Sequence, residues 1–229
     1  MKYGFGIDLG GTTVKLAYFD ENGTMLDKWE IPTVTANGGQ QILPDIAASV
    51  KNYLEKNSIA PESILGLGIG VPGPVDGKGV VNKCINLGWG VFNIAETLSS
   101  LTGFPVKAGN DANVAALGEY WKGGGAGCEN MVFVTLGTGV GGGIVIGGNL
   151  LHGSHGSGAE IGHMVLNPRE TIPCNCSKWR KICPGFSVQR CRRIRRLQTG
   201  NGCFRKIKEK YNVQITGTES PAAGFCLGH

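Results

Sequence analysis

The sequence predicts an α/β protein built from two related lobes. Three apolar segments joined by tight turns come first, helical and extended patterns then alternate, and a strand–glycine loop–strand pattern occurs twice. The 229 residues suffice for one sizeable domain or for two small lobes that share a cleft. Because 41% of the residues are apolar and 17% are charged, neither bulk disorder nor a fibrous fold is expected.

The N-terminal third predicts an antiparallel start. Lys2–Leu9 and Thr13–Phe19 are rich in β-branched and aromatic residues and flank a glycine turn. A second turn signal, Glu21–Gly23, precedes a third expected strand at Thr24–Ile31. Consecutive strands joined by such short turns pair antiparallel.

Helices and strands alternate in the next segment. Gln40–Glu55 has the i, i+3, i+4 spacing of an amphipathic helix, with Pro44 in its first turn. The apolar run Ile64–Val71 predicts a buried strand, Ile94–Leu101 a short helix and Pro105–Ala108 another strand.

The last regular pattern is a helix followed by two strands. We expect Asp111 to cap a helix over Ala112–Trp121, which ends before three glycines. Strands are expected at Met131–Leu136 and Gly143–Ile146, on either side of a glycine-rich loop.

Charge divides the chain abruptly. Residues 1–173 hold 10 basic and 15 acidic side chains, whereas residues 174–229 hold 12 and 2, so the net charge changes from −5 to +10. Six of the eight cysteines and seven of the eight arginines also lie in the basic segment. No apolar run approaches the ~18–20 residues that span a bilayer, and the N-terminus lacks a signal-peptide core, so we expect a cytoplasmic protein without membrane attachment.

The first glycine hairpin is a candidate phosphate-binding site. Glycines at a hairpin tip allow backbone N–H groups to approach phosphate oxygens, threonines add hydroxyl donors and a lysine adds positive charge. An aspartate at the end of the preceding strand suits indirect contact with Mg²⁺. The alternative is an ordinary glycine hairpin. The candidates are Asp8, Gly10, Gly11, Thr12, Thr13 and Lys15.

A second loop of the same kind, which includes Gly137, Thr138 and Gly139, follows the strand at Met131–Leu136. By itself a glycine run is a weak signal. Two such loops together predict that two lobes clamp one nucleotide.

Asn110 and Asp111 lie between a strand and a helix. Asp111 is either only a helix cap or a carboxylate that accepts a hydroxyl proton during phosphoryl transfer. Further along, Glu160 and His163 share one face if their segment is helical and could bind vicinal sugar hydroxyls. His163 could instead bind zinc, because Cys174 and Cys176 follow it, although a fourth ligand is not evident.

In combination these motifs resemble the ROK family of sugar kinases, within the actin/hexokinase-type superfamily. The resemblance covers residues 3–176 and rests on the ordered segments DLGGTTVK, GIGVPGPVD, NLGW, NDANVAALGE, LGTGVGGG, GAEIGHM and CNC. The segment Val80–Phe92 is most similar to bacterial glucokinases. The fold implied is an RNase H-like, two-lobed α/β fold whose second lobe is incomplete here.

The resemblance implies an ATP- and Mg²⁺-dependent kinase that transfers phosphate to a hexose, with glucose favoured and a homodimer as the assembly. The glycine loops would hold the ATP phosphates, and Asp111 would be the general base. Asn110, Glu160 and His163 would orient the sugar, and His163 would also bind a structural Zn²⁺ with Cys174 and Cys176. N-acetylmannosamine, fructose and an inactive kinase remnant remain alternatives.

The resemblance ends where the basic segment begins. The family continues with another zinc cysteine and a glutamate, whereas this chain has Lys181 at the cysteine position and Cys183 two residues late. We therefore expect an N-terminal lobe at residues 1–110, the start of a second lobe at 111–176, and an aberrant basic tail at 177–229 produced by truncation or a frameshift.

Two alternatives belong to other functional classes. The basic tail could bind nucleic acid, although it has no convincing DNA-reading motif. Its arginine cluster consists of Arg190, Arg192, Arg193, Arg195 and Arg196. The family also contains sugar-responsive repressors, but these carry an N-terminal helix-turn-helix, for which a strand beginning by Tyr3 leaves no room.

Overall fold

The computed structural model describes the chain except for residues 83, 137–139, 154–155, 164–212, 217–222 and 228–229. The chain forms two compact units. The first holds Met1–Val114 with Ser154–Ser157, and the second holds Ala115–Gly153 with Gly158–His229. The boundary falls inside helix α4 (Asp111–Lys122), so one helix belongs to both units.

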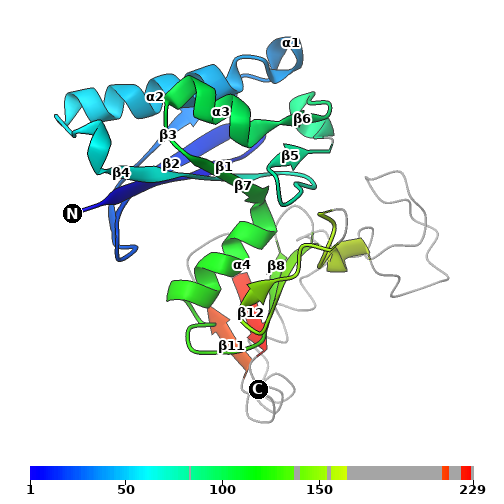
Figure 1. The fold of residues 1–229 in the computed structure, drawn as a ribbon. Helices are drawn as coiled ribbons and strands as arrows, with labels where there is room; N and C mark the ends of the chain where they lie inside the picture. The colour runs from blue at the N-terminus through cyan, green and yellow to red at the C-terminus, as the bar shows by residue number, and fades with distance from the viewer. Residues whose placement is uncertain (83, 137–139, 154–155, 164–212, 217–222, 228–229) are drawn as a thin grey trace. The chain divides into compact units, whose positions relative to one another are not determined.

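The first unit is built on a five-stranded mixed sheet in the order β3-β2-β1-β4-β7 (Figure 1). Its strands are β1 (Tyr3–Leu9), β2 (Thr13–Asp20), β3 (Met25–Pro32), β4 (Ile64–Val71) and β7 (Val106–Asn110). The pairs β1–β2 and β2–β3 are antiparallel, whereas β4 pairs parallel to both β1 and β7. The predicted antiparallel start is confirmed, and β4 has the predicted bounds.

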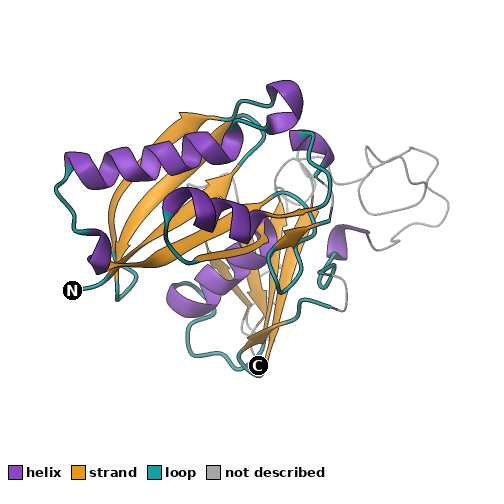
Figure 2. Cartoon of the chain, turned by 45° about the horizontal axis from the view of Figure 1, so that its top comes forward, coloured by secondary structure: helices purple, strands orange, loops and turns teal. Residues whose placement is uncertain are grey.

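Two helices cover one face of this sheet, as Figures 1 and 2 both show: α2 (Ile42–Lys56) and α3 (Ile94–Thr102). The predicted amphipathic face of α2 is buried, and Pro44 is tolerated as its third residue because the first turn needs no N–H donor there. Helix α3 begins after Asn93, whose side chain accepts the Glu96 N–H at 3.1 Å, and ends at Gly103 with φ 82°.

Short elements connect these parts. They are α1 (Ala36–Gly39), η1 (Pro61–Ser63), β5 (Val80–Val81), η2 (Ile85–Leu87) and β6 (Phe92–Asn93). The core of the first unit lies between the sheet and the two helices. Its fully buried side chains include Leu9, Leu16, Ile46, Val50, Ile69 and Leu98.

The second unit contains an antiparallel sheet in the order β10-β9-β8-β12-β11. The strands are β8 (Met131–Leu136), β9 (Val140–Ile146), β10 (Asn149–Leu150), β11 (Val213–Thr216) and β12 (Ala223–Leu227). A small cluster of Ala116, Met131, Phe133 and Val145 forms its described core, and η3 (Ile161–His163) follows. No helix in the described part of the chain is long and apolar enough to cross a membrane.

Strand β9 begins three residues before the predicted Gly143. Residues we interpreted as loop glycines pair with β8 in regular register, from Leu136 opposite Val140 onward. Gly142 accommodates a close approach, because a Cβ there would lie 2.7 Å from Cδ1 of Ile161. Glycines of this segment therefore serve packing within a strand.

Candidate functional site

The turn between β1 and β2 exposes backbone rather than side chains. The Gly10 N–H donates to the Thr13 carbonyl at 3.0 Å. A Cβ on Gly10 would lie 2.8 Å from that oxygen, whereas one on Gly11 would meet nothing within 4 Å. The close approach of the Thr13 carbonyl therefore requires glycine at position 10, whereas the space beside Gly11 is open. The tip has the bare backbone that close approach of a phosphate requires.

Thr33 anchors this turn, a role that the sequence analysis missed. Its N–H donates to the Thr12 carbonyl at 2.9 Å, and its Oγ1 donates to the Gly10 carbonyl at 2.8 Å. The residue lies just beyond β3, 23 positions after Gly10. No local pattern marks such a contact, because it depends on β3 pairing beside β2.

The candidate residues of the first unit meet at the carboxyl ends of the parallel strands. Asp8 on β1 lies in register with Gly70 on β4, and Gly70 in turn with Gly109 on β7. Gly70 and Gly109 thus lie in register beside Asp8. Asp111 follows β7 close to Gly70, because a Cβ on Gly70 would lie 3.5 Å from the Asp111 Cα. Lys15 lies opposite Asp8 on β2. In α/β sheets this edge is where ligands bind.

Asn110, rather than Asp111, caps helix α4, which corrects the sequence prediction. The Asn110 Oδ1 accepts the N–H groups of Ala112 at 3.0 Å and Asn113 at 3.2 Å. Its Nδ2 donates to the Gly73 carbonyl at 3.1 Å, so the Pro-Gly-Pro loop after β4 orients it. Because Asn110 takes the cap, Asp111 begins the helix and its carboxylate is not needed as the N-cap.

The environment of Asp111 favours its protonated form. Solvent reaches the side chain, yet the surrounding protein desolvates the carboxyl and raises its pKa; the negative charge of Asp8 acts in the same direction. The Ala112 N–H, 2.8 Å from the Asp111 Oδ1, opposes the shift without cancelling it. A carboxylate with a raised pKa is a better proton acceptor than an ordinary surface aspartate.

The remaining sequence candidates belong to the second unit or lie outside the described residues. Glu160 Oε2 and His163 Nε2 are 3.6 Å apart around η3, and both side chains are about 40% exposed. The adjacent pair that the spacing predicted is therefore formed, in a 3₁₀ turn. Gly137, Thr138, Gly139, Cys174 and Cys176 lie outside the described part of the chain. Within that part, no group of three or more His, Cys, Asp or Glu residues could hold a metal ion.

Comparisons with known proteins agree on one family. The model of the ROK family matches residues 4–189. A glucokinase from Halalkalibacterium halodurans is 45% identical over 174 residues, which are 76% of this chain and 53% of that protein. A ROK family glucokinase from Streptomyces griseus, solved in complex with glucose and AMPPNP, superposes with a TM-score of 0.69 at 30% identity, covering 92% of this chain and 66% of the other. An N-acetylmannosamine kinase from Escherichia fergusonii is 34% identical over 176 residues, 75% of this chain and 57% of that protein.

The chain belongs to the ROK family. Its fold is the actin/hexokinase-type α/β fold of the family's solved kinases. The chain spans about half the length of the curated relatives it matches. Those relatives include sugar kinases, among them several glucokinases.

Proposed function

We propose that this protein is built for ATP-dependent phosphorylation of a hexose, with glucose as the favoured acceptor and glucose 6-phosphate as the product. The observation that carries the proposal is the position of Asp111. It lies at the carboxyl edge of the first sheet, the same edge at which β1 ends with Asp8 before the Gly10–Gly11 turn, and its pKa is raised.

Asp111 would act as the general base. A sugar 6-hydroxyl that attacks a γ-phosphoryl group must lose its proton, and a positioned carboxylate typically contributes ~10²–10⁴-fold to such a step. Asn110 keeps one Nδ2 hydrogen free after its bond to Gly73 and could donate it to the sugar. Glu160 and His163 are proposed as further sugar contacts.

The phosphate side would be supplied by the two glycine loops. The hairpin of Gly10, Gly11, Thr12 and Thr13 offers backbone and hydroxyl donors, and Lys15 offers a positive charge. Gly137, Thr138 and Gly139 are proposed to act in the same way from the second loop. Fixed donors of this kind offset negative charge without reorganising during transfer.

Asp8 suits indirect contact with a hydrated Mg²⁺ ion. Two carboxylates at one sheet edge, one of which raises the pKa of the other, leave excess negative charge that a cation would balance. Mg²⁺ typically takes one or two carboxylates and keeps several waters, and would help to neutralise the ATP phosphates. A zinc site cannot be built from the described residues, which contain only His163 of the expected ligands, so zinc stays a prediction.

The acceptor sugar is the least constrained part of the proposal. The N-acetylmannosamine kinase among the relatives keeps that sugar as a second candidate, and fructose a third. An inactive remnant is the remaining alternative, because the chain spans about half the length of the glucokinases it matches. A homodimer and a cytoplasmic location likewise stay predictions.

A coupled assay of ADP release tests the proposal on the purified full chain with glucose, N-acetylmannosamine and fructose. We expect turnover with at least one sugar, and a loss of about 10²–10⁴-fold in Asp111→Asn with sugar binding largely retained. Glu55→Gln, an exposed carboxylate of α2, is the matched control and should leave the rate unchanged. Full activity in Asp111→Asn would refute the base assignment, and no turnover of the wild-type chain with any sugar would favour the remnant.

A further inference from the structure

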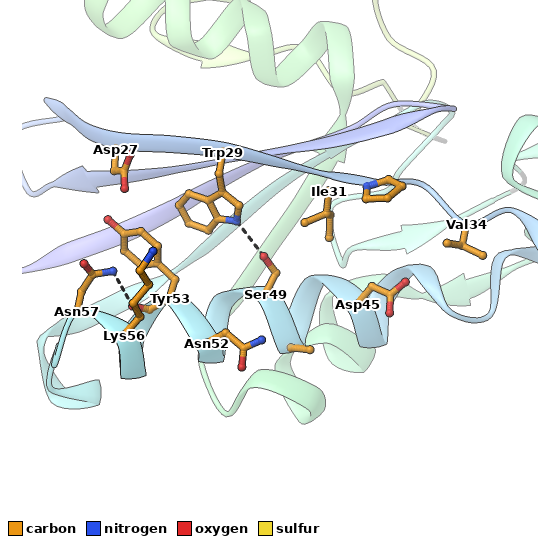
Figure 3. Close-up of a pocket in the computed structure, with 12 residues that line it drawn as sticks. Asp27, Trp29, Ile31, Val34, Asp45, Ser49, Asn52, Tyr53, Lys56 and Asn57 are labelled. Carbon is orange, nitrogen blue, oxygen red and sulfur yellow. Dashed lines mark hydrogen bonds between the residues drawn. The ribbon is translucent and has the colours of Figure 1, made fainter.

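A groove lies between the edge strand β3 and helix α2, on residues that the proposed kinase chemistry does not use. Its volume is about 570 Å³, within the range of small-molecule sites. Side chains of both β3 and α2 line this groove (Figure 3). Strand β3 supplies every second residue, Asp27, Trp29 and Ile31, and α2 supplies the face that runs from Asp45 to Lys56.

The floor of the groove is a rigid aromatic pair. The rings of Trp29 and Tyr53 stack with centroids 4.4 Å apart and planes 2° from parallel, and Phe5 meets both edge-on. The Trp29 Nε1–H donates to Ser49 Oγ at 2.8 Å, which fixes the indole in its plane (Figure 3). Tyr53 covers one indole face, and the remaining surface of the half-buried Trp29 contributes to the lining of the groove.

Polar groups surround this floor. Asp45 lies at one end, Asn52 lies along α2, and Asp27, Lys56 and Asn57 lie at the other end (Figure 3). Two carboxylates against one ammonium leave the lining slightly negative. The groove therefore disfavours phosphorylated or carboxylated ligands, yet it offers several acceptors and amide donors for neutral hydroxyl groups.

We propose that this groove is a second carbohydrate site, which binds an unphosphorylated sugar. A pyranose has C–H groups on its faces and hydroxyls around its rim. The C–H face would lie on Trp29, while the rim hydroxyls would reach Asp45 and Asn52. The match of an apolar aromatic floor with a weakly negative, hydrogen-bonding rim selects this class of ligand. The inference does not depend on the proposed phosphoryl transfer.

A peptide added to β3 as an extra strand is the competing occupant. Its main-chain hydrogen bonds would have to come from the outer edge of β3. That strand carries Lys28 and Glu30 and ends at Pro32, which are features that discourage edge pairing. The groove also takes most of its polar groups from α2, whereas a peptide paired with β3 would use the main chain of that strand.

Equilibrium dialysis of the full chain against radiolabelled glucose, without nucleotide, tests the site. Ala48→Trp places a large ring in the groove from an exposed position of α2. Lys51→Trp introduces the same ring on the same helix outside the groove and is the matched control. We expect Ala48→Trp to lose one equivalent of bound glucose and Lys51→Trp to bind as the wild type does.

The outcomes separate this site from the kinase site. If only the kinase proposal fails, the wild-type chain still binds one equivalent of glucose in the groove, and Ala48→Trp abolishes that binding. Asn52→Ala removes an exposed amide at the rim of the groove and should raise the dissociation constant of the glucose bound there about three- to tenfold. This variant keeps the inference testable if Ala48→Trp folds poorly. Glucose binding unchanged in both variants would overturn the inference.

Discussion

Asp8 and Asp111 lie at the same edge of the first sheet, and the residue of β4 between them is a glycine, Gly70, which places no side chain there. Gly70 is the register partner of both Asp8 and Gly109, and Asp111 follows β7 immediately above Gly70. Desolvation raises the pKa of Asp111, and the Asp8 charge raises it further. The Asp8 charge therefore adds to the effect of desolvation on the basicity of Asp111.

Replacing Asp8 should change the pH dependence of the reaction. In Asp8→Asn the neighbouring negative charge is gone, so the pKa of Asp111 falls toward its ordinary value. Because the base must be deprotonated, the acid limb of the kcat/KM profile should move to lower pH, even if kcat itself decreases through weaker Mg²⁺ binding. Glu62→Gln, an exposed carboxylate before β4, should leave the profile in place. An unmoved acid limb in Asp8→Asn would show that the two carboxyls are not coupled.

The Thr33 contacts predict a defect in nucleotide binding without unfolding. Thr33→Val keeps the size of the side chain and the N–H bond to Thr12 but removes the hydroxyl that donates to Gly10. We expect the KM for ATP to rise several-fold because the turn is less firmly held, while the melting temperature falls by only about 2–4 °C, since one hydrogen bond contributes ~1 kcal/mol to stability. Thr35→Val, nearby and exposed, is the control. An equal effect of both substitutions would contradict a specific anchor.

The loop before α2 should be sensitive to one added methyl group. Gly39 has φ 67°, and a Cβ there would lie 2.6 Å from the Leu87 carbonyl and 2.8 Å from the Trp89 Nε1. The Trp89 indole also donates to the Gly39 carbonyl at 3.2 Å. Gly39→Ala should therefore lower the free energy of unfolding by about 2–4 kcal/mol, from backbone strain and displaced packing.

Urea denaturation measures this change. Gly90→Ala is the matched control, because Gly90 lies one residue beyond Trp89 and a Cβ there would meet nothing within 4 Å. We expect the control to change the midpoint by less than about 0.5 kcal/mol in equivalent free energy. A Gly39→Ala protein as stable as the control would show that the two loops can separate without cost.

Some features of the site could be predicted from sequence because they are local. The turn at Gly10 and Gly11, the strand Ile64–Val71 and the amphipathic face of α2 each follow from residues adjacent in the chain. The sequence pattern places the cap of α4 one residue late, because Asn110 and Asp111 are both good caps and the contact of Asn110 with the Gly73 carbonyl is not local. The extent of β9 was missed because glycine signals a loop wherever its strand partner is unknown.

The sequence by itself determined the order of the longer elements from β1 to β9, the two glycine-rich segments and the family, because hydrophobic periodicity, turn chemistry and motif order are written along the chain. Only the tertiary structure decided that Thr33 anchors the first loop, that Asp8 acts on the pKa of Asp111, and that Trp29 and Tyr53 form the floor of a groove. Those relationships join residues more than 20 positions apart. They depend on strand register and helix packing, which a local pattern does not specify.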